Sequence, residues 1–147
     1  MAEQTTDRIQ VELVTPDKLM LREEVSGVSL PGREGYLGIL PGHAPLLTVL
    51  KAGQLSYTQG TVTHYLFVGG GFAEVQPHRV TVLVDASERP EEIDVERARR
   101  AQQRAEERLR EAGAGETEID ALRAQASLQR AMSRLEVAER AKQGQRA

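Results

Sequence analysis

The feature that most constrains the fold is an abrupt change in composition between Asp85 and Pro90. Ten of the 13 glycines and all five aromatic residues lie before residue 88. After Pro90 the chain is dominated by Ala, Arg, Glu and Gln. Glycine and aromatic residues favour turns and strands, whereas the later residues favour helices. The sequence therefore predicts a β part, residues 1–87, followed by a helical part, residues 88–147.

In the first part, short segments rich in β-branched and aromatic residues recur between turn residues. They are Ile9–Val14, Val25–Leu30, Leu55–Thr58, Val62–Val68, Phe72–Val75 and Val80–Val84. Several of them alternate apolar and polar residues, so we expect one face of each strand to be buried and the other to be wet. The spacing predicts an antiparallel β-sandwich or flattened barrel.

The second part has the period and the residue propensities of helices. Pro90 suits the first turn of one helix. The chain pauses at Gly113–Gly115, and Thr117 with Asp120 resembles a capping box that starts a second helix. We therefore expect an antiparallel two-helix hairpin after the sandwich.

Alanine lines the predicted contact between the two helices. The seam residues are Ala98, Ala101, Ala105, Leu109 and Ala112 on the first helix, and Ala121, Ala124, Leu128, Ala131, Leu135 and Ala138 on the second. An alanine side chain buries little apolar area, and burial contributes only about 25 cal/mol per Å². The hairpin is therefore expected to be marginally stable and able to move.

Composition excludes several kinds of function. The formal net charge of −3 argues against nucleic-acid binding, which needs a basic surface. The chain contains no cysteine, no apolar run long enough to span a membrane and no signal-peptide segment. We expect any membrane association to come through a partner protein.

No motif for catalysis or metal binding is present. His43, His64 and His78 fall in three separate segments, and Gly69–Gly71 joins two predicted strands, which indicates a turn or bulge and not a phosphate cradle. We therefore expect no catalytic residues and no metal ligands.

Arginines form a stripe on each predicted helix: Arg97, Arg100, Arg104 and Arg108 on the first, and Arg123, Arg130 and Arg134 on the second. One interpretation is a solvated charged face, supported by the i,i+4 pairs Glu96–Arg100, Glu106–Arg110 and Glu136–Arg140. The other is an anion site, because Arg130 and Arg134 have no carboxylate three or four residues away. Two such arginines would repel unless an anion such as a polyphosphate lay between them.

Several segments resemble, in the expected order, the epsilon subunits of bacterial F-type ATP synthases. They are Gly35–Thr48, Gly69–Val75, Val80–Asp85, Ile93–Ala98 and Arg130–Ala138. The resemblance extends from about Ile9 to Arg140. It implies a non-catalytic rotor subunit of the central stalk that helps to couple proton translocation to ATP synthesis. The protein would lie at the cytoplasmic face of the bacterial cell membrane as a peripheral part of the complex.

In this family the sandwich binds the gamma subunit and the ring of c subunits. The residues of this chain that the resemblance places in the c-ring-facing loop are Arg33, Glu34, Tyr36, Gly42 and His43. Tyr36 stands where some relatives carry an acid. An acidic contact to the ring is therefore not carried over to this chain.

The family's helical arm either folds onto the sandwich or extends along gamma toward the alpha and beta subunits of the catalytic head, where it inhibits ATP hydrolysis. In relatives that bind ATP, the nucleotide holds the arm down as a regulatory ligand, and no cofactor is required. The implied ATP contacts in this chain are Ile93, Asp94, Arg97, Ala98, Arg104, Arg130 and Arg134, with Glu88 as a further candidate. An alternative is that the motif serves only helix packing, with Asp94 paired to Arg97.

Two other functions stay open from the sequence. The protein could be a free-standing ATP-binding switch that acts apart from the synthase. It could also be an enzyme built on a β-sandwich, although its scattered histidines argue against a clustered active site.

Overall fold

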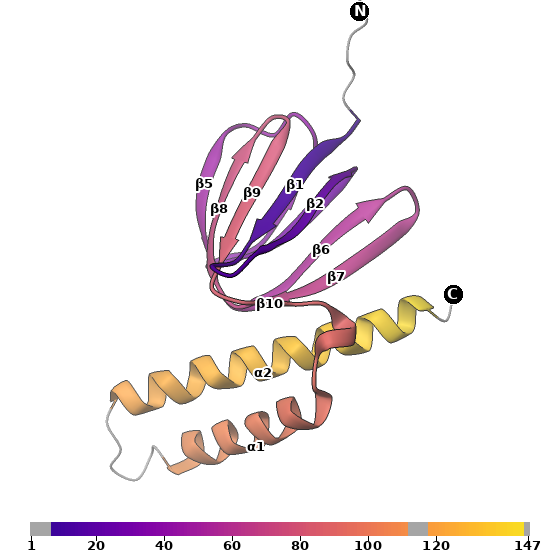
Figure 1. The fold of residues 1–147 in the computed structure, drawn as a ribbon. Coiled ribbons are helices and arrows are strands. Elements are labelled where there is room, and N and C mark those ends of the chain that lie inside the picture. Colours follow the sequence, from indigo (N-terminus) through magenta and orange to yellow (C-terminus); the bar gives the residue numbers. More distant parts are fainter. Residues whose placement is uncertain (1–6, 112–117, 146–147) are drawn as a thin grey trace, which may run out of the picture.

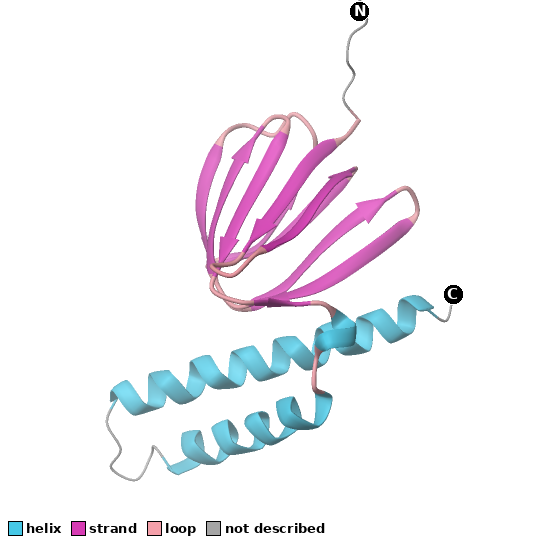
Figure 2. Ribbon diagram, in the orientation of Figure 1, coloured by secondary structure: helices cyan, strands magenta, loops and turns pink. Residues whose placement is uncertain are grey.

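The protein is a folded β-sheet with two helices lying across one end of it (Figure 1). The computed structural model describes residues 7–111 and 118–145. Figure 2 shows the same division into a strand region and a helical region that the composition predicts. The strands are β1 (Ile9–Val14), β2 (Leu19–Val25), β3 (Gly27–Gly32), β4 (Gly35–Ile39), β5 (Leu46–Leu50), β6 (Gly53–Gln59), β7 (Val62–Val68), β8 (Gly71–Gln76), β9 (Arg79–Val84) and β10 (Ser87–Glu88).

The strands form one ten-stranded sheet in the order β10-β7-β6-β3-β5-β8-β9-β1-β2, with β4 paired to β3. All pairs are antiparallel except β1 with β9, which run parallel. The sheet folds over so that β2 approaches β6, where the Gln59 amide donates to the Glu23 carboxylate (3.2 Å) and to the Glu24 carbonyl (3.3 Å). The predicted sandwich or flattened barrel is therefore confirmed, with one parallel pair that the alternation did not reveal.

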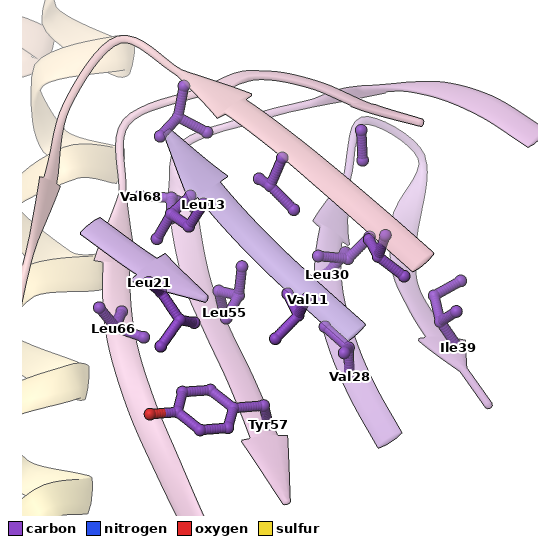
Figure 3. Packing of buried hydrophobic residues seen from close by; sticks show 14 of the residues in the cluster. Val11, Leu13, Leu21, Val28, Leu30, Ile39, Leu55, Tyr57, Leu66 and Val68 are labelled. Atoms are coloured by element: carbon purple, nitrogen blue, oxygen red, sulfur yellow. The ribbon is translucent and has the colours of Figure 1, made fainter. Parts of the chain in front are cut away.

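The core of the sandwich is made by the inward-facing side chains of its strands (Figure 3). Val11 and Leu13 on β1, Leu30 on β3 and Leu55 on β6 are all completely buried. On β1 and β6 the residues next to them in sequence are more exposed, as the two-residue period of a strand requires. The core is thus closed by strands alone, without a contribution from either helix.

Five strands differ from the sequence expectation, among them the short β10, which was not predicted. Val25–Leu30 is wrong as a single strand, because the chain turns at Ser26, whose amide (2.8 Å) and hydroxyl (3.0 Å) both donate to the Thr58 carbonyl. Strands β2, β4 and β5 were not predicted: β2 carries the charged run Arg22–Glu24, β4 is rich in glycine, and β5 follows a proline-rich loop. The turn expected at Gly69–Gly71 is present, with Gly70 at φ +112°.

The helical part begins later than expected. Pro90–Glu92 is a 3-10 turn, and Ile93 is extended (φ −78°, ψ 124°). Helix α1 then spans Val95–Glu111, and helix α2 spans Glu118–Gln145. The predicted pause at Gly113–Gly115 and the capping residue Thr117 lie outside the described residues. Strand β10 straddles the predicted division between residues 87 and 88, so the last strand of the sheet leads directly into the arm.

The two helices pack through alanine, as predicted. Ala98 and Ala105 on α1, and Ala124 and Ala131 on α2, are each less than 5% exposed. The seam prediction missed Val137, which is fully buried because α2 has a second contact face. Val137 clusters with Phe67 of β7 and with Ile93, so α2 lies between the strands and α1 (Figure 1).

Candidate functional site

A cleft of about 510 Å³ opens between α1 and α2. Its lining residues are Glu88, Glu92, Asp94, Arg97, Ala98, Ala101, Arg104, Ala105, Arg108, Ser127, Arg130, Ala131 and Arg134. Six of the seven predicted ATP contacts are among them, and so is the further candidate Glu88. Ile93 is the exception, because its side chain is buried against Phe67 and Val137 outside the cleft.

Positive charge predominates in the cleft. Five arginines line it, three from α1 and two from α2, against three carboxylates. Arg108 was part of the predicted stripe but was not predicted as a contact; it comes one turn after Arg104 and therefore faces the same side of α1. Arg100 of the same stripe does not line the cleft. The arrangement is suited to an anion with several negative charges, which the arginines of both helices can reach.

Arg134 has partners that the sequence did not reveal. Its Nε donates to Glu88 Oε1 at 2.9 Å, and its guanidinium lies 4.3 Å from the centre of the Phe67 ring. The prediction that Arg134 lacks an acidic partner is therefore wrong, because the partner lies 46 residues earlier on β10. A search three or four residues along one helix cannot find such a contact.

Arg130 has a different environment. Its side chain is exposed, and its Nη2 donates to Ser127 Oγ at 3.2 Å. Within the described residues it forms no ion pair. The prediction of an unpaired cation is therefore confirmed at Arg130 and not at Arg134.

Asp94 caps helix α1. Its Oδ1 accepts a hydrogen bond from the backbone N–H of Arg97 at 3.1 Å, which satisfies one of the free donors of the first helical turn. The alternative interpretation paired the Asp94 and Arg97 side chains, but they form no ion pair among the described residues, so the Arg97 guanidinium is available to the cleft.

The predicted i,i+4 ion pairs on the outer faces of the helices are not formed. Glu96 pairs instead with Arg99, at 2.8 Å and i,i+3. In the part of the chain that the structure describes, Glu106–Arg110 and Glu136–Arg140 are also not ion-paired. The local ion pairs that supported the interpretation of a solvated charged face are therefore not present in this part of the chain.

The residues of the predicted c-ring-facing loop do not form one surface. Arg33 and Glu34 make the turn between β3 and β4, and Tyr36 follows on β4, where its hydroxyl accepts a hydrogen bond from the backbone N–H of Gln54 at 3.3 Å. Gly42 and His43 lie beyond the other end of β4, where the Gly42 amide donates to the Pro77 carbonyl at 2.8 Å. The five residues therefore divide between opposite ends of β4.

The histidines make no metal site. His64 stacks on Tyr57 with ring centres 4.8 Å apart, and His43 Nδ1 lies 2.7 Å from the Ala44 carbonyl oxygen. Among the described residues, no three His, Cys, Asp or Glu side chains gather in a way that could hold a metal ion. No helix in the described parts of the chain has the length and apolar character needed to cross a membrane.

Comparison with known families accounts for both parts of the chain. The beta-sandwich domain of the ATP synthase delta/epsilon chain matches residues 8–90, and the long alpha-helix domain of the same chain matches residues 91–139. The chain belongs to the delta/epsilon family of ATP synthase subunits. As an epsilon-type subunit of ATP synthase it is non-catalytic, so the alternative of an enzyme is excluded.

The relatives are similar over most of their length. The ATP synthase epsilon chain of Koribacter versatilis is 54% identical over 107 residues, which cover 73% of this chain and 75% of that one. The epsilon chain of Thermodesulfovibrio yellowstonii is 50% identical over 111 residues, covering 76% and 79%. A chain in the structure of Euglena gracilis mitochondrial ATP synthase, with OSCP, F1 and the c ring, shares the fold: the TM-score is 0.76 at 24% identity, over 96% of this chain and 85% of that chain.

Proposed function

We propose that this subunit binds the gamma subunit and the c ring through its sandwich, and that ATP in the cleft holds its helical arm against the sandwich. Bound ATP would then act as a regulatory ligand that limits the arm's inhibition of ATP hydrolysis in the catalytic head. The observation that carries the regulatory part is the set of five arginines that line one cleft between two helices.

The cleft requires both helices. Arg97, Arg104 and Arg108 come from α1, and Arg130 and Arg134 come from α2. An anion bound between them neutralises the repulsion that otherwise separates the two stripes. A polyphosphate therefore favours the closed hairpin over any state in which the helices move apart.

The rest of the packing leaves the docked and undocked states of the arm close in free energy. Its seam is alanine, and the described apolar residues that it buries against the sandwich form one small cluster with Phe67. A ligand specific for the docked state contributes about 1.4 kcal/mol at ten times its dissociation constant. That is enough to move an even balance to roughly ten to one. Millimolar ATP can therefore switch the arm without tight binding.

Limited proteolysis of the full chain tests the switch. Trypsin cuts after arginines, and α1 offers sites between Arg97 and Arg110. We expect ATP to slow cleavage in this helix, and Arg130→Ala to abolish the protection while the sandwich stays intact. Arg123→Ala is the matched control, because Arg123 is also exposed on α2 but does not line the cleft. Equal cleavage of the wild type with and without ATP would refute the regulatory part of the proposal.

Binding to the rotor is tested separately. We expect the tagged subunit to recover gamma and c subunits from detergent-solubilised membranes. Recovery of neither would favour the free-standing switch. A calorimetric titration with ATP, with and without Mg²⁺, then measures the affinity in either case and shows whether the metal takes part.

A further inference from the structure

We propose that Phe67 and Glu88 form a receptor on the sandwich that orients the Arg134 guanidinium toward the cleft, so that the anion site is complete only when α2 is docked. This inference rests on the proposed function, because it concerns how the same cleft is regulated. It adds a positioning residue, Phe67, that does not line the cleft.

The receptor is built by the last strand of the sheet. Glu88 and Phe67 are direct partners across the antiparallel pair β10·β7, so their side chains lie on the same face. The pairing is reinforced by Ser87, whose hydroxyl donates to the Phe67 carbonyl at 2.9 Å. A strand of only two residues thus places a carboxylate beside an aromatic ring.

These two side chains fix the guanidinium in two directions. Glu88 Oε1 accepts a hydrogen bond from Arg134 Nε at 2.9 Å. The Phe67 ring covers one face of the guanidinium, with its centre 4.3 Å from the guanidinium carbon. Among the described residues, neither terminal nitrogen of Arg134 makes a hydrogen bond. Because the guanidinium carries five donors in a planar fork, its Nη groups stay available for an anion in the cleft that Arg134 lines.

The site is therefore divided between two bodies. Phe67 and Glu88 belong to the sheet, whereas Arg134 and Arg130 belong to α2. If α2 leaves the sheet, Arg134 loses both constraints and regains its freedom of rotation. Preorganisation by the sandwich thus raises the affinity of the docked state, and by reciprocity an anion in the cleft stabilises docking.

The test measures ATP affinity and docking on the full chain. The affinity is measured by calorimetry for the wild type and for Phe67→Leu, which keeps an apolar side chain but removes the ring. The docked fraction is measured in each from the distance between two labels. The chain has no cysteine, so Val62→Cys on β7 and Glu139→Cys on α2 give unique labelling sites.

We expect Phe67→Leu to weaken ATP binding about threefold to tenfold, which is the size of a partly desolvated cation–π contact. This loss of affinity should be larger than any accompanying loss of docked fraction explains. In an Arg134→Lys background, which lacks the planar fork, the same change should have less than a twofold effect. Val137→Ala is the control, since Val137 lies in the same cluster but does not line the cleft. It should lower affinity only in proportion to the docked fraction.

The outcomes separate the two proposals. Unchanged affinity in Phe67→Leu, or a loss fully explained by undocking, overturns the positioning role while ATP binding itself stands. A wild-type chain that does not bind ATP overturns the proposed regulation and, with it, this inference.

Discussion

The sandwich and the arm are stabilised in opposite ways. Of the described residues, 19 buried side chains form the single core of the sandwich, whereas the cluster that fixes the arm to the sheet contains three: Phe67, Ile93 and Val137. Between the helices, the buried residues are alanines. The sandwich therefore holds itself together, while the arm depends on a few contacts and on charge. A region of the second kind can respond to a ligand that contributes little free energy.

The largest effect should come from removing a core side chain of the sandwich. Leu55 is completely buried on β6, and we expect Leu55→Ala to lower the free energy of unfolding by about 3 kcal/mol through lost burial and a residual cavity. The half-buried Leu128 on α2 is the matched control, and Leu128→Ala should cost less than about 1 kcal/mol. Urea denaturation measures both. Equal losses would show that the two regions are stabilised alike.

A smaller effect is expected at Gly42, the glycine among the predicted c-ring-facing residues. Gly42 has φ +85°, so Gly42→Val should introduce about 1–3 kcal/mol of backbone strain and weaken proton-driven ATP synthesis in reconstituted vesicles. Gly38 does not have a positive φ, and its Cβ position meets no atom within 4 Å, so a side chain there introduces neither backbone strain nor a clash. Gly38→Val is therefore the control. If both variants synthesise ATP as the wild type does, this end of β4 is not in the coupling path.

Truncation of the chain tests whether the sandwich folds without the arm. The expected loss of stability is smaller than in the two preceding predictions. A chain that ends at Pro90 keeps β10, whereas one that ends at Ala86 loses its pairing with β7 and the hydroxyl bond from Ser87. We expect both to fold and to bind gamma, with the shorter chain less stable by about 1–2 kcal/mol. Circular dichroism with thermal unfolding compares them. An unfolded 1–90 chain would mean that the arm supports the sandwich, contrary to the comparison above.

The smallest effect is a pH dependence inside the sandwich. Burial, and secondarily the Glu23 carboxylate, raise the pKa of the Tyr57 hydroxyl above its ordinary value near 10, while Arg89 opposes them. The folded state therefore favours the protonated phenol, whose contribution is complete below about pH 10 and is lost as the pH rises through the raised pKa. Tyr57→Phe lacks this loss. Urea midpoints of the two proteins should keep a constant difference up to about pH 10 and converge or cross above it; a constant difference throughout would contradict the shift.

Local pattern was sufficient for most of the fold. Ile9–Val14 and Val62–Val68 match their strands residue for residue, because alternation and β-branched content act within one segment. The missed strands β2 and β4 contain residues that disfavour strands locally, three charges in one and two glycines in the other. Their pairing with β1 and β3 outweighs that propensity, which a single segment cannot show.

The same limit applies to the cleft. Helical spacing placed Arg97 and Arg104 in one stripe of the first helix, since helical period is local, and the family resemblance implied that they and Arg130 line one site. The partnership of Arg134 with Glu88 and Phe67 was beyond reach, because it joins three segments that only the docking of α2 brings together. Ile93 was misplaced for a similar reason: its burial depends on Val137, 44 residues later.

That separation along the chain fixes the order of events during synthesis. The strands are complete by residue 88, but the side chain that covers Phe67 and Ile93 belongs to the last helix to leave the ribosome. At 5–20 residues per second, Val137 is added roughly 2 to 9 s after Ile93. During that interval the nascent sandwich presents an uncovered aromatic ring, and the arm cannot serve as its folding nucleus. Each new chain therefore completes its sheet first and its arginine-lined cleft last.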